Sequence, residues 1–291
     1  MKALYELSAP AKLNLFLHIT GRRDDGYHLL QSVFMLIDWC DTLHVELRQD
    51  GQLSREDLGP SLPPDDLVLR AARALQAFAA PGQGAHIGVM KRIPAEAGMG
   101  GGSSDAATCL LALNRLWGLH LPLARLERIG LALGADVPFF LRGRNAWVEG
   151  VGEQITPVTL PAAQFAVLKP PTGLATAKIF SADDLQRATP AAILYGFAEN
   201  DTAQSLKLKN EIFGFGRNDL QPVAQRLNPQ VSQALEWLGS QGLDARMTGS
   251  GSAVFAKLNL PQSTLLHNPP PDWQLRICSN LAVHPLAGWV G

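Results

Sequence analysis

The stretch IPAEAGMGGGSSDAAT, residues 93–108, has the residue types and spacing to hold an anion such as phosphate. Its glycines are followed directly by two serines: Gly98, Gly100, Gly101, Gly102, Ser103 and Ser104. Glycines let a backbone approach an anion closely, and hydroxyl groups could bond phosphate oxygens or approach a metal ion. However, Gly102 is followed by serine and not by the lysine of a Walker loop, and the acidic residue expected downstream in a dinucleotide-binding fold is missing. The loop therefore predicts an anion site that takes its positive charge from elsewhere in the chain.

The residues on either side predict a strand before this loop and a helix after it. Residues 85–91 have strand character, and apolar residues then recur at helical intervals: Ala106, Leu110, Leu113 and Trp117. A helix N-terminus presents free N–H groups and a partial positive charge, so it suits a phosphate. Ser103 and Ser104 are candidate caps of this helix. The alternative is an ordinary flexible turn capped by serine, and the order of strand, glycines and helix favours the anion site.

A lysine and an aspartate far from the loop in sequence could complete such a site. Residues 11–19, AKLNLFLHI, alternate in polarity and predict a half-buried strand with Lys12 and Asn14 on its polar face. Asp136 follows a helix predicted over residues 123–133 and precedes a proline. Phosphoryl transfer needs a group that orients or accepts the proton of a hydroxyl, and cations that neutralise the phosphates. Taken singly, Lys12 could be a solvated strand lysine and Asp136 an ordinary turn residue.

The remaining elements mix strands and helices without regular alternation, which favours an α+β fold. A helix is predicted after Asp66, another near residues 229–238, and a second glycine turn, MTGSGSAVF at 247–255, precedes a late strand. Pro157 and Pro161 interrupt the pattern. We therefore predict two domains, residues 1–157 and 158–291.

Composition excludes several classes of function. The 291 residues carry a formal net charge of −1, which argues against a nucleic-acid or membrane-surface binder. No apolar stretch approaches the length that crosses a bilayer, and the first residues lack the pattern of a signal peptide. The three cysteines are widely spaced and fit buried thiols in a reducing compartment. We expect a cytoplasmic protein that binds neither nucleic acid nor membranes.

Three segments taken together resemble the GHMP kinases, a superfamily that phosphorylates small molecules. They are PAKLNLFLHI at 10–19, PAEAGMGGGSSDAAT at 94–108 and RMTGSGSAVF at 246–255. Further segments are similar to the branch that phosphorylates the 2-hydroxyl of a cytidine-diphosphate-linked methylerythritol in the non-mevalonate isoprenoid pathway. These are GRRDDGYHLLQSVF at 21–34, LGADVPFFL at 133–141 and GRNDLQPVA at 216–224. The ordered set spans almost the whole chain.

The resemblance implies a two-domain GHMP kinase fold, with a ribosomal-protein-S5-like N-terminal domain and a ferredoxin-like C-terminal domain. It implies ATP as co-substrate, Mg²⁺, and Lys12 and Asp136 as the catalytic pair. The loop would bind the ATP phosphates through Pro94, Ala95, Glu96, Ala97, Gly98, Met99, Gly100, Gly101, Gly102, Ser103 and Ser104. The small-molecule substrate would be bound by Asn14 and Thr176 on the acceptor side and by Tyr27, His28 and Phe180 at the cytidine ring. Residues 248–252 would brace the site from the second domain.

Two details remain open at this level. The sequence has no dedicated carboxylate cluster for a metal, so Ser104 is only a candidate ligand. Glu96 places a negative charge beside a phosphate site, so we expect its side chain to point away.

The alternatives to the cytidine-linked substrate are another small alcohol such as homoserine, and a nucleotide-binding sensor without catalysis. The Gly26-Tyr27-His28 segment argues against the first alternative, and intact Lys12 and Asp136 argue against the second.

Overall fold

Two long strands organise the N-terminal half of the protein. The computed structural model describes residues 2–192, 211–259, 266 and 269–290. Strands β1 (Ala3–Arg22) and β2 (His28–Arg48) form an antiparallel hairpin, paired from Ala3 opposite Glu46 to Arg22 opposite His28. The other edge of β2 pairs with two further strands. The C-terminal part of β2 pairs with β4 (Gly84–Met90), which pairs in turn with β3 (Leu53–Asp57). The N-terminal part of β2 pairs with β5 (Ala146–Glu149), which pairs in turn with β6 (Gln154–Pro157).

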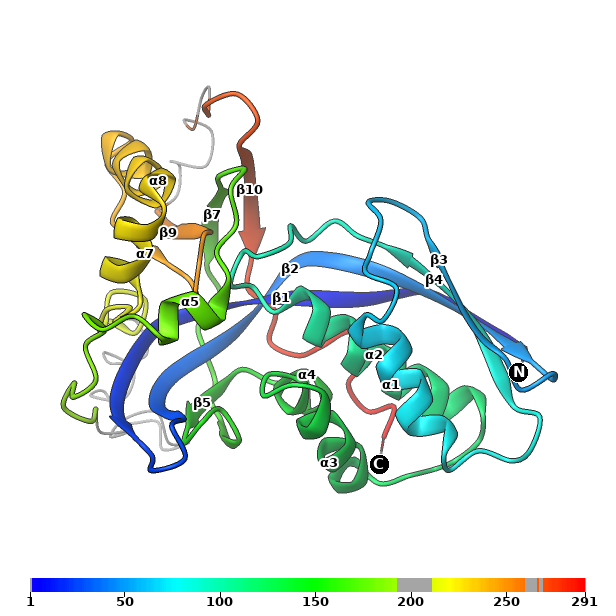
Figure 1. The fold of residues 1–291 in the computed structure, drawn as a ribbon. Helices are drawn as coiled ribbons and strands as arrows, with labels where there is room; N and C mark the ends of the chain where they lie inside the picture. The colour runs from blue at the N-terminus through cyan, green and yellow to red at the C-terminus, as the bar shows by residue number, and fades with distance from the viewer. Residues whose placement is uncertain (1, 193–210, 260–265, 267–268, 291) are drawn as a thin grey trace.

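Four helices cover one face of this sheet (Figure 1). They are α1 (Leu67–Gln76), α2 (Gly101–Leu116), α3 (Leu123–Leu133) and α4 (Val137–Arg142). Their buried residues form one core with the sheet, and α2 lies at its centre with twelve buried residues, including Leu110 and Leu113. Burial on most sides explains why α2 is so rich in alanine and leucine.

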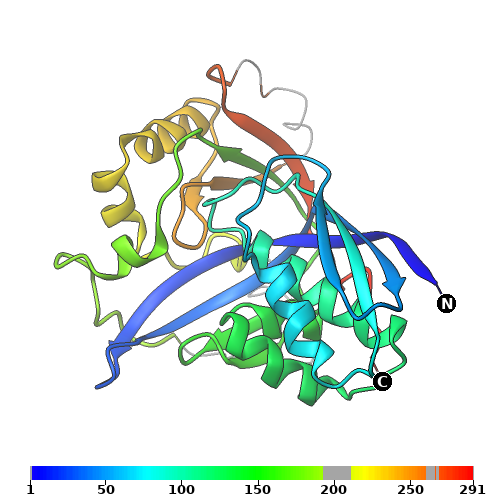
Figure 2. The ribbon, with the colours of Figure 1, turned by 45° about the vertical axis from the view of Figure 1, so that its right-hand side comes forward.

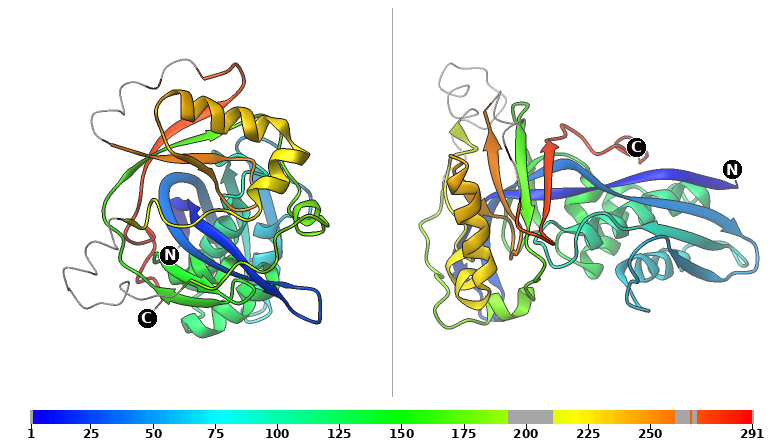
Figure 3. Two further views of the ribbon diagram at one scale, coloured as in Figure 1. Left: turned by 90° about the vertical axis from the view of Figure 1, so that its left-hand side faces the viewer. Right: turned by 90° about the horizontal axis from the view of Figure 1, so that it is seen from above.

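A second, four-stranded antiparallel sheet stands across the end of the long hairpin (Figure 3). Its order is β10 (Gln274–Ser279), β7 (Gln164–Lys169), β9 (Val254–Leu258), β8 (Ala245–Met247). Helices α5 (Thr176–Phe180), α7 (Gln221–Leu227) and α8 (Pro229–Ser240) connect β7 to β8, and α7 and α8 contribute to its core. In chain order the strands lie 4-1-3-2, which is the ferredoxin-like arrangement.

Strand β1 joins the two sheets and is buried on both faces. Leu17 and Ile19 belong to the core of the second sheet, and the Leu17 N–H donates to Arg217 O at 2.9 Å. The strand predicted over residues 11–19 is confirmed, but its half-buried character is wrong: Lys12, Asn14 and His18 are 4%, 1% and 7% exposed. Polar residues alternate with apolar ones because the polar face contacts other parts of this chain rather than water.

The other predicted elements mostly agree with the structure. The helix over 123–133 and the strand before the glycine loop are confirmed, the strand running from 84 to 90. The capping role of Ser103 and Ser104 is wrong, because α2 begins at Gly101 and its N-cap is Gly100, whose φ of 71° only glycine adopts readily. In the part of the chain that is described, no helix has the length and apolar character needed to span a membrane.

The division at residue 157 stays a prediction. Strand β6 ends at Pro157 and β7 begins at Gln164. The last described residues return to the first sheet, where the Leu281 N–H donates to Leu36 O at 2.9 Å and the His284 N–H to Gly143 O at 2.8 Å. Figure 2 shows both chain ends on the side of α1 to α3, away from the second sheet.

Candidate active site

A cleft of about 780 Å³ opens between the glycine loop, β1, the start of α4 and α5. Lys12, Asn14 and Asp136 line it, together with every predicted loop residue from 94 to 103. Thr176 and Phe180 line its other wall, whereas Ser104, Tyr27 and His28 are not part of the lining. The structure thus brings most of the predicted site together from segments that lie more than a hundred residues apart.

The glycine loop holds its shape by interlocking with the turn at 248–252. The Ser252 N–H donates to Glu96 O at 3.1 Å, and the Ala253 N–H to Ala97 O at 3.3 Å. A Cβ atom on Gly98, whose φ is 72°, would lie 2.2 Å from Thr248 O. The turn therefore braces the loop, as predicted, and glycine is required where the two backbones touch.

The N-terminus of α2 leaves backbone donors beside the cleft. The first bond within the helix runs from Ser104 N–H to Gly100 O at 2.9 Å. The N–H groups of Gly101, Gly102 and Ser103 precede it and have no acceptor within the helix. All three residues line the cleft, so this helix end can receive an anion.

Lys12 and Asp136 meet at the bottom of the cleft. The Lys12 Nζ lies 3.7 Å from Asp136 Oδ2, 4.7 Å from the centre of the Phe34 ring, and donates to Asn14 Oδ1. Burial lowers the pKa of Lys12, and the Asp136 carboxylate opposes that shift. Asp136 is the N-cap residue of α4, but its side chain makes no capping hydrogen bond and keeps 30% exposure. The carboxylate therefore remains accessible from the cleft while its charge is balanced by the lysine.

Asn14 is fixed on three sides. Its Nδ2 donates to Ser32 Oγ at 2.9 Å, and its backbone N–H donates to Thr248 Oγ1 at 2.8 Å. Because the amide nitrogen is engaged by Ser32, the amide oxygen faces Lys12. On the opposite wall Thr176 Oγ1 lies 2.7 Å from Ser250 Oγ, which ties α5 to the same turn that braces the loop.

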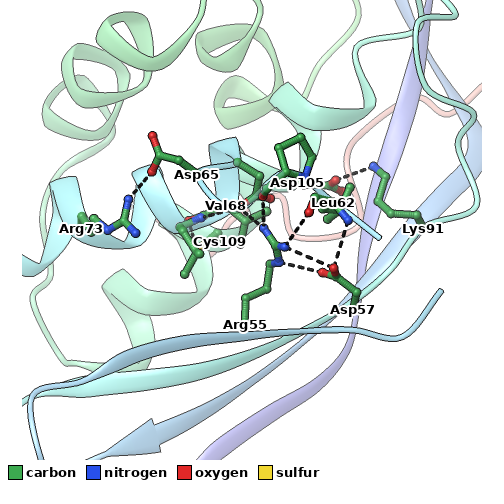
Figure 4. A network of polar contacts seen from close by, with 12 residues as sticks. Arg55, Asp57, Leu62, Asp65, Val68, Arg73, Lys91, Asp105 and Cys109 are labelled. Carbon is green, nitrogen blue, oxygen red and sulfur yellow. Dashed lines mark hydrogen bonds and ion pairs between the residues drawn. The ribbon is translucent and has the colours of Figure 1, made fainter. Parts of the chain in front are cut away.

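A second lysine at the cleft, Lys91, was not singled out by the sequence analysis. Its Nζ lies 2.5 Å from Asp105 Oδ2 (Figure 4). It also contacts Asp41, and both carboxyl groups are nearly inaccessible. Burial raises the pKa of Asp105 to about 8 against the opposing effect of Lys91. Asp41 Oδ1 also accepts from the Ile93 N–H at 2.8 Å, which anchors the start of the loop. Asp41 and Asp105 both engage the Lys91 ammonium group, so it does not serve as the loop's free cation.

The apolar end of the cleft is shaped by the segment before α1. Leu62, Pro63 and Leu67 line it. Arg55 holds this segment in place, with contacts of 2.7 Å to both Asp57 and Asp66 and a hydrogen bond to Leu62 O at 3.2 Å (Figure 4). This rim offers three apolar side chains in the same cleft as the anion-binding loop.

Tyr27 and His28 lie at the border of the cleft, beyond Phe180. Tyr27 is 64% exposed. The His28 ring lies 5.3 Å from the Phe180 ring, centre to centre, and Arg187 Nε donates to His28 Nε2 at 3.2 Å. Arg187 was missed because it lies in an irregular segment after α5 and carries no motif.

The two open details have partial answers. The exposed Glu96 side chain lies against Gly173, where an added Cβ atom would come within 2.2 Å of Glu96 Oε2, and Glu96 still lines the cleft, so its orientation away from a phosphate stays a prediction. Within the described residues no group of three or more His, Cys, Asp or Glu side chains could hold a metal ion. The Ser104 Oγ is buried and has no hydrogen-bond partner there.

Comparison with known proteins gives matches along the chain. Residues 66–144 match the GHMP kinases N terminal domain, and residues 194–259 match the family described as GHMP kinases C terminal. The chain is 73% identical, over 99% of both chains, to the 4-diphosphocytidyl-2-C-methyl-D-erythritol kinase of Variovorax paradoxus (strain S110). It is 61% identical to the protein of the same name from Polaromonas sp. (strain JS666), covering 99% of this chain and 95% of that one.

Solved structures agree with these matches. A crystal structure of 4-(cytidine 5'-diphospho)-2C-methyl-D-erythritol kinase has a TM-score of 0.74 and 32% identity, covering 94% of this chain and 98% of that chain. A homoserine kinase from Cytophaga hutchinsonii has a TM-score of 0.66 at 15% identity, covering 98% of this chain and 96% of that one. The second likeness is one of fold alone.

Proposed function

The chain belongs to the GHMP kinase family, and from this premise we propose that it transfers the γ-phosphate of ATP to the 2-hydroxyl of 4-diphosphocytidyl-2-C-methyl-D-erythritol. The observation that carries the proposal is the Lys12–Asp136 pair, 3.7 Å apart, in one cleft with the free N–H groups of α2. The identity of 73% to a kinase named for this acceptor supports the choice of substrate.

In the proposed reaction Asp136 accepts or orients the proton of the acceptor hydroxyl. The hydroxyl oxygen bonds to the γ-phosphorus, the bond from that phosphorus to the β–γ bridging oxygen breaks, and ADP leaves. Lys12 stabilises the charge that develops on the phosphoryl oxygens, in a site where burial strengthens electrostatic effects. The N–H groups of Gly101, Gly102 and Ser103 hold phosphate oxygens, and the rim of Leu62, Pro63 and Leu67 suits the flat adenine ring.

Mg²⁺ would enter with ATP, because it usually keeps several waters and binds through phosphates and one or two protein oxygens. Ser104 fits such a role in one respect: its buried hydroxyl is left without a partner in the described part of the chain. The ion would neutralise part of the phosphate charge. The protein's own residues supply the position of the nucleotide and the proton acceptor.

The acceptor substrate would lie between Asn14 and Thr176 on one side and the Tyr27–His28–Phe180 group on the other. Phe180 and Tyr27 provide ring faces for stacking, and His28 provides a hydrogen bond. We further propose that the enzyme acts in the cytoplasm and binds neither nucleic acid nor membranes, on the basis of its near-neutral charge.

A coupled ADP-release assay tests the proposal. We expect turnover with the cytidine-linked methylerythritol and none above background with homoserine. Tyr27→Ala and His28→Ala should raise KM for the cytidine substrate much more than KM for ATP. Phosphorylation of homoserine but not of the cytidine substrate would make the enzyme a different GHMP kinase, and ATP binding without turnover of either would make it a nucleotide sensor.

A further inference from the structure

The segment GRNDLQPVA at 216–224 takes no part in the proposed phosphoryl transfer, yet two of its polar side chains are buried. Asn218 and Asp219 are each 3% exposed, and neither lines the cleft. Buried polar side chains in native proteins are hydrogen-bonded. The role of these two residues must therefore come from what they bind within the protein.

The backbone of this segment is attached to β1. The Leu17 N–H donates to Arg217 O at 2.9 Å, and the Asp219 N–H donates to Leu17 O at 2.8 Å. These two bonds flank Asn218, which pairs with Leu17 as in a parallel ladder. Asp219 Oδ2 also accepts from the Ile19 N–H at 2.8 Å. The position of Asn218 is therefore fixed by the strand that carries the predicted catalytic lysine.

The Asn218 side chain reaches the turn that braces the glycine loop. Its Nδ2 donates to Met247 O at 2.9 Å and to Gly249 O at 2.8 Å, which uses both of its hydrogens. Its Oδ1 accepts from the Leu220 N–H at 2.9 Å, so the amide nitrogen is the end that faces the turn. The amide group thus holds the backbone on both sides of Thr248.

Thr248 lies between β1 and the glycine loop. Its Oγ1 accepts from the Asn14 N–H at 2.8 Å. Its carbonyl oxygen lies so close to Gly98 that a Cβ atom added there would come within 2.2 Å of it. A displacement of Thr248 would therefore reach the glycine loop directly.

Of these two neighbours, the loop resists displacement less than the strand. β1 is paired with β2, with Lys12 opposite Leu36 and Asn14 opposite Phe34. Residues 93–99 of the loop belong to no helix or strand, and segments without such ladders open at lower free energy. Loss of the amide bonds to the turn should therefore displace the loop and leave the strand in place.

We propose that Asn218 is a positioning residue for ATP, which holds Thr248 against Gly98 and so keeps the glycine loop in the conformation that binds the phosphates. This inference rests on the proposed function and adds a residue outside the cleft on which nucleotide binding depends. The role requires an amide, because a carboxylate of the same shape would present oxygen and no donor to two carbonyl oxygens.

The test is Asn218→Asp, which keeps the size of the side chain and the acceptor for the Leu220 N–H but removes both donors to the turn. The Kd for ATP, measured by calorimetry without acceptor substrate, should rise about ten-fold or more. In turnover assays KM for ATP should rise as well, while KM for the cytidine-linked substrate should change less than about three-fold.

Asn114→Asp is the matched control. Asn114 is also buried, and its amide binds the backbone of Leu121, accepting from the N–H at 2.9 Å and donating to the carbonyl oxygen at 3.2 Å. It lies near the end of α2 that is opposite the glycine loop. This variant should lower Tm as Asn218→Asp does and leave the Kd for ATP unchanged. If the carboxyl variants do not fold, Asn218→Ala and Asn114→Ala give the same comparison without a new charge.

Combining Asn218→Asp with Gly98→Ala tests the route through Thr248. The glycine substitution disturbs the same contact from the side of the loop. Because both changes act on one contact, the double variant should lose less ATP affinity than the product of the two single losses. A loss equal to that product would overturn the inference.

An unchanged Kd for ATP in folded Asn218→Asp would also overturn it. An equal loss of ATP affinity in Asn114→Asp would do the same, because the effect would then follow stability and not position. Absence of turnover of the cytidine-linked substrate by the wild-type protein would overturn the proposed function instead. The calorimetric comparison needs no acceptor and still decides the role of Asn218.

Discussion

Replacing Lys12 with methionine should nearly abolish turnover and leave stability almost unchanged. Removing one preorganised group that stabilises transition-state charge lowers kcat by about 10²–10³. Removing one partner of a buried ion pair is destabilising because it leaves the other charge buried and unpaired, so the loss is small where that partner is partly solvated. Asp136 keeps 30% exposure, so it stays partly solvated without its partner. The lost contact with the Phe34 ring costs about 0.5–2 kcal/mol. This cost is offset because methionine, unlike the ammonium group, has no charge to be desolvated on folding.

Lys91→Met provides the matched control, since both lysines are buried at the same cleft. It leaves Asp41 and Asp105 without their cation, and these side chains are 0% and 2% exposed. Breaking a buried ion pair from one side costs about 3–5 kcal/mol. We expect the lower end, because Asp105, with a pKa of about 8, is already largely protonated near neutral pH, so chiefly Asp41 is left without its cation. Lys91→Met should therefore unfold at clearly lower urea concentration than wild type, while Lys12→Met should not.

The assays are urea unfolding followed by circular dichroism, and ADP release at saturating substrates. The reasoning fails if Lys12→Met is destabilised as much as Lys91→Met, because Lys12 would then be a structural ion-pair partner. It fails equally if Lys12→Met keeps more than a tenth of the wild-type kcat.

Three further changes test other parts of the site. Asp136→Asn should reduce turnover by at least about 100-fold while the Kd for ATP, measured by calorimetry, changes little; full activity would show that this carboxylate handles no proton. Gly98→Ala would place a Cβ atom 2.2 Å from Thr248 O, so KM for ATP should rise about ten-fold or more, whereas Gly118→Ala, also at positive φ but with open space around it, should leave KM unchanged. The folded-state pKa of Asp105, about 8, lies above its ordinary value of about 3.8, so the stability that its protonated carboxyl contributes is fully present below about 3.8 and is lost progressively until the pH reaches about 8. Asp105→Asn should therefore gain in Tm relative to wild type as the pH rises from about 5 to about 8, with little further change above 8, and parallel Tm curves over that range would contradict this assignment.

Local sequence patterns correctly predicted the elements whose formation depends on residues close together in the chain. The helix over 123–133 and the glycine loop leading into α2 follow from apolar spacing and from glycine content. The predicted two-domain α+β GHMP kinase fold is confirmed, and it rested on motifs spread over the whole chain. The burial of Lys12 was missed, because alternation in β1 cannot distinguish a face in water from one that contacts another domain.

The parts of the site that escaped prediction depend on contacts between distant segments. Asp41, Lys91 and Asp105 come from β2, the end of β4 and α2, and each by itself resembles an ordinary surface charge. Arg187 meets His28 across 159 residues of sequence. Such contacts depend on how strands, helices and sheets pack in three dimensions, which the spacing of residues along the chain does not predict.

The glycine loop at 94–104 has no lysine of its own, and its positive charge and its conformation are supplied by two different parts of the chain. Among the described residues two lysines line the cleft, but Lys91 is held by Asp41 and Asp105, and Asp41 in turn anchors the start of the loop. Of these two lysines, Lys12, paired with a partly exposed Asp136, is the one that can turn its charge toward a bound phosphate. The loop's conformation depends on the turn at 248–252, which belongs to the second sheet and touches Gly98 backbone to backbone. Because one wall of the anion site is made by the C-terminal part of the chain, the N-terminal part alone would not hold the loop in the form that presents its N–H groups to a phosphate.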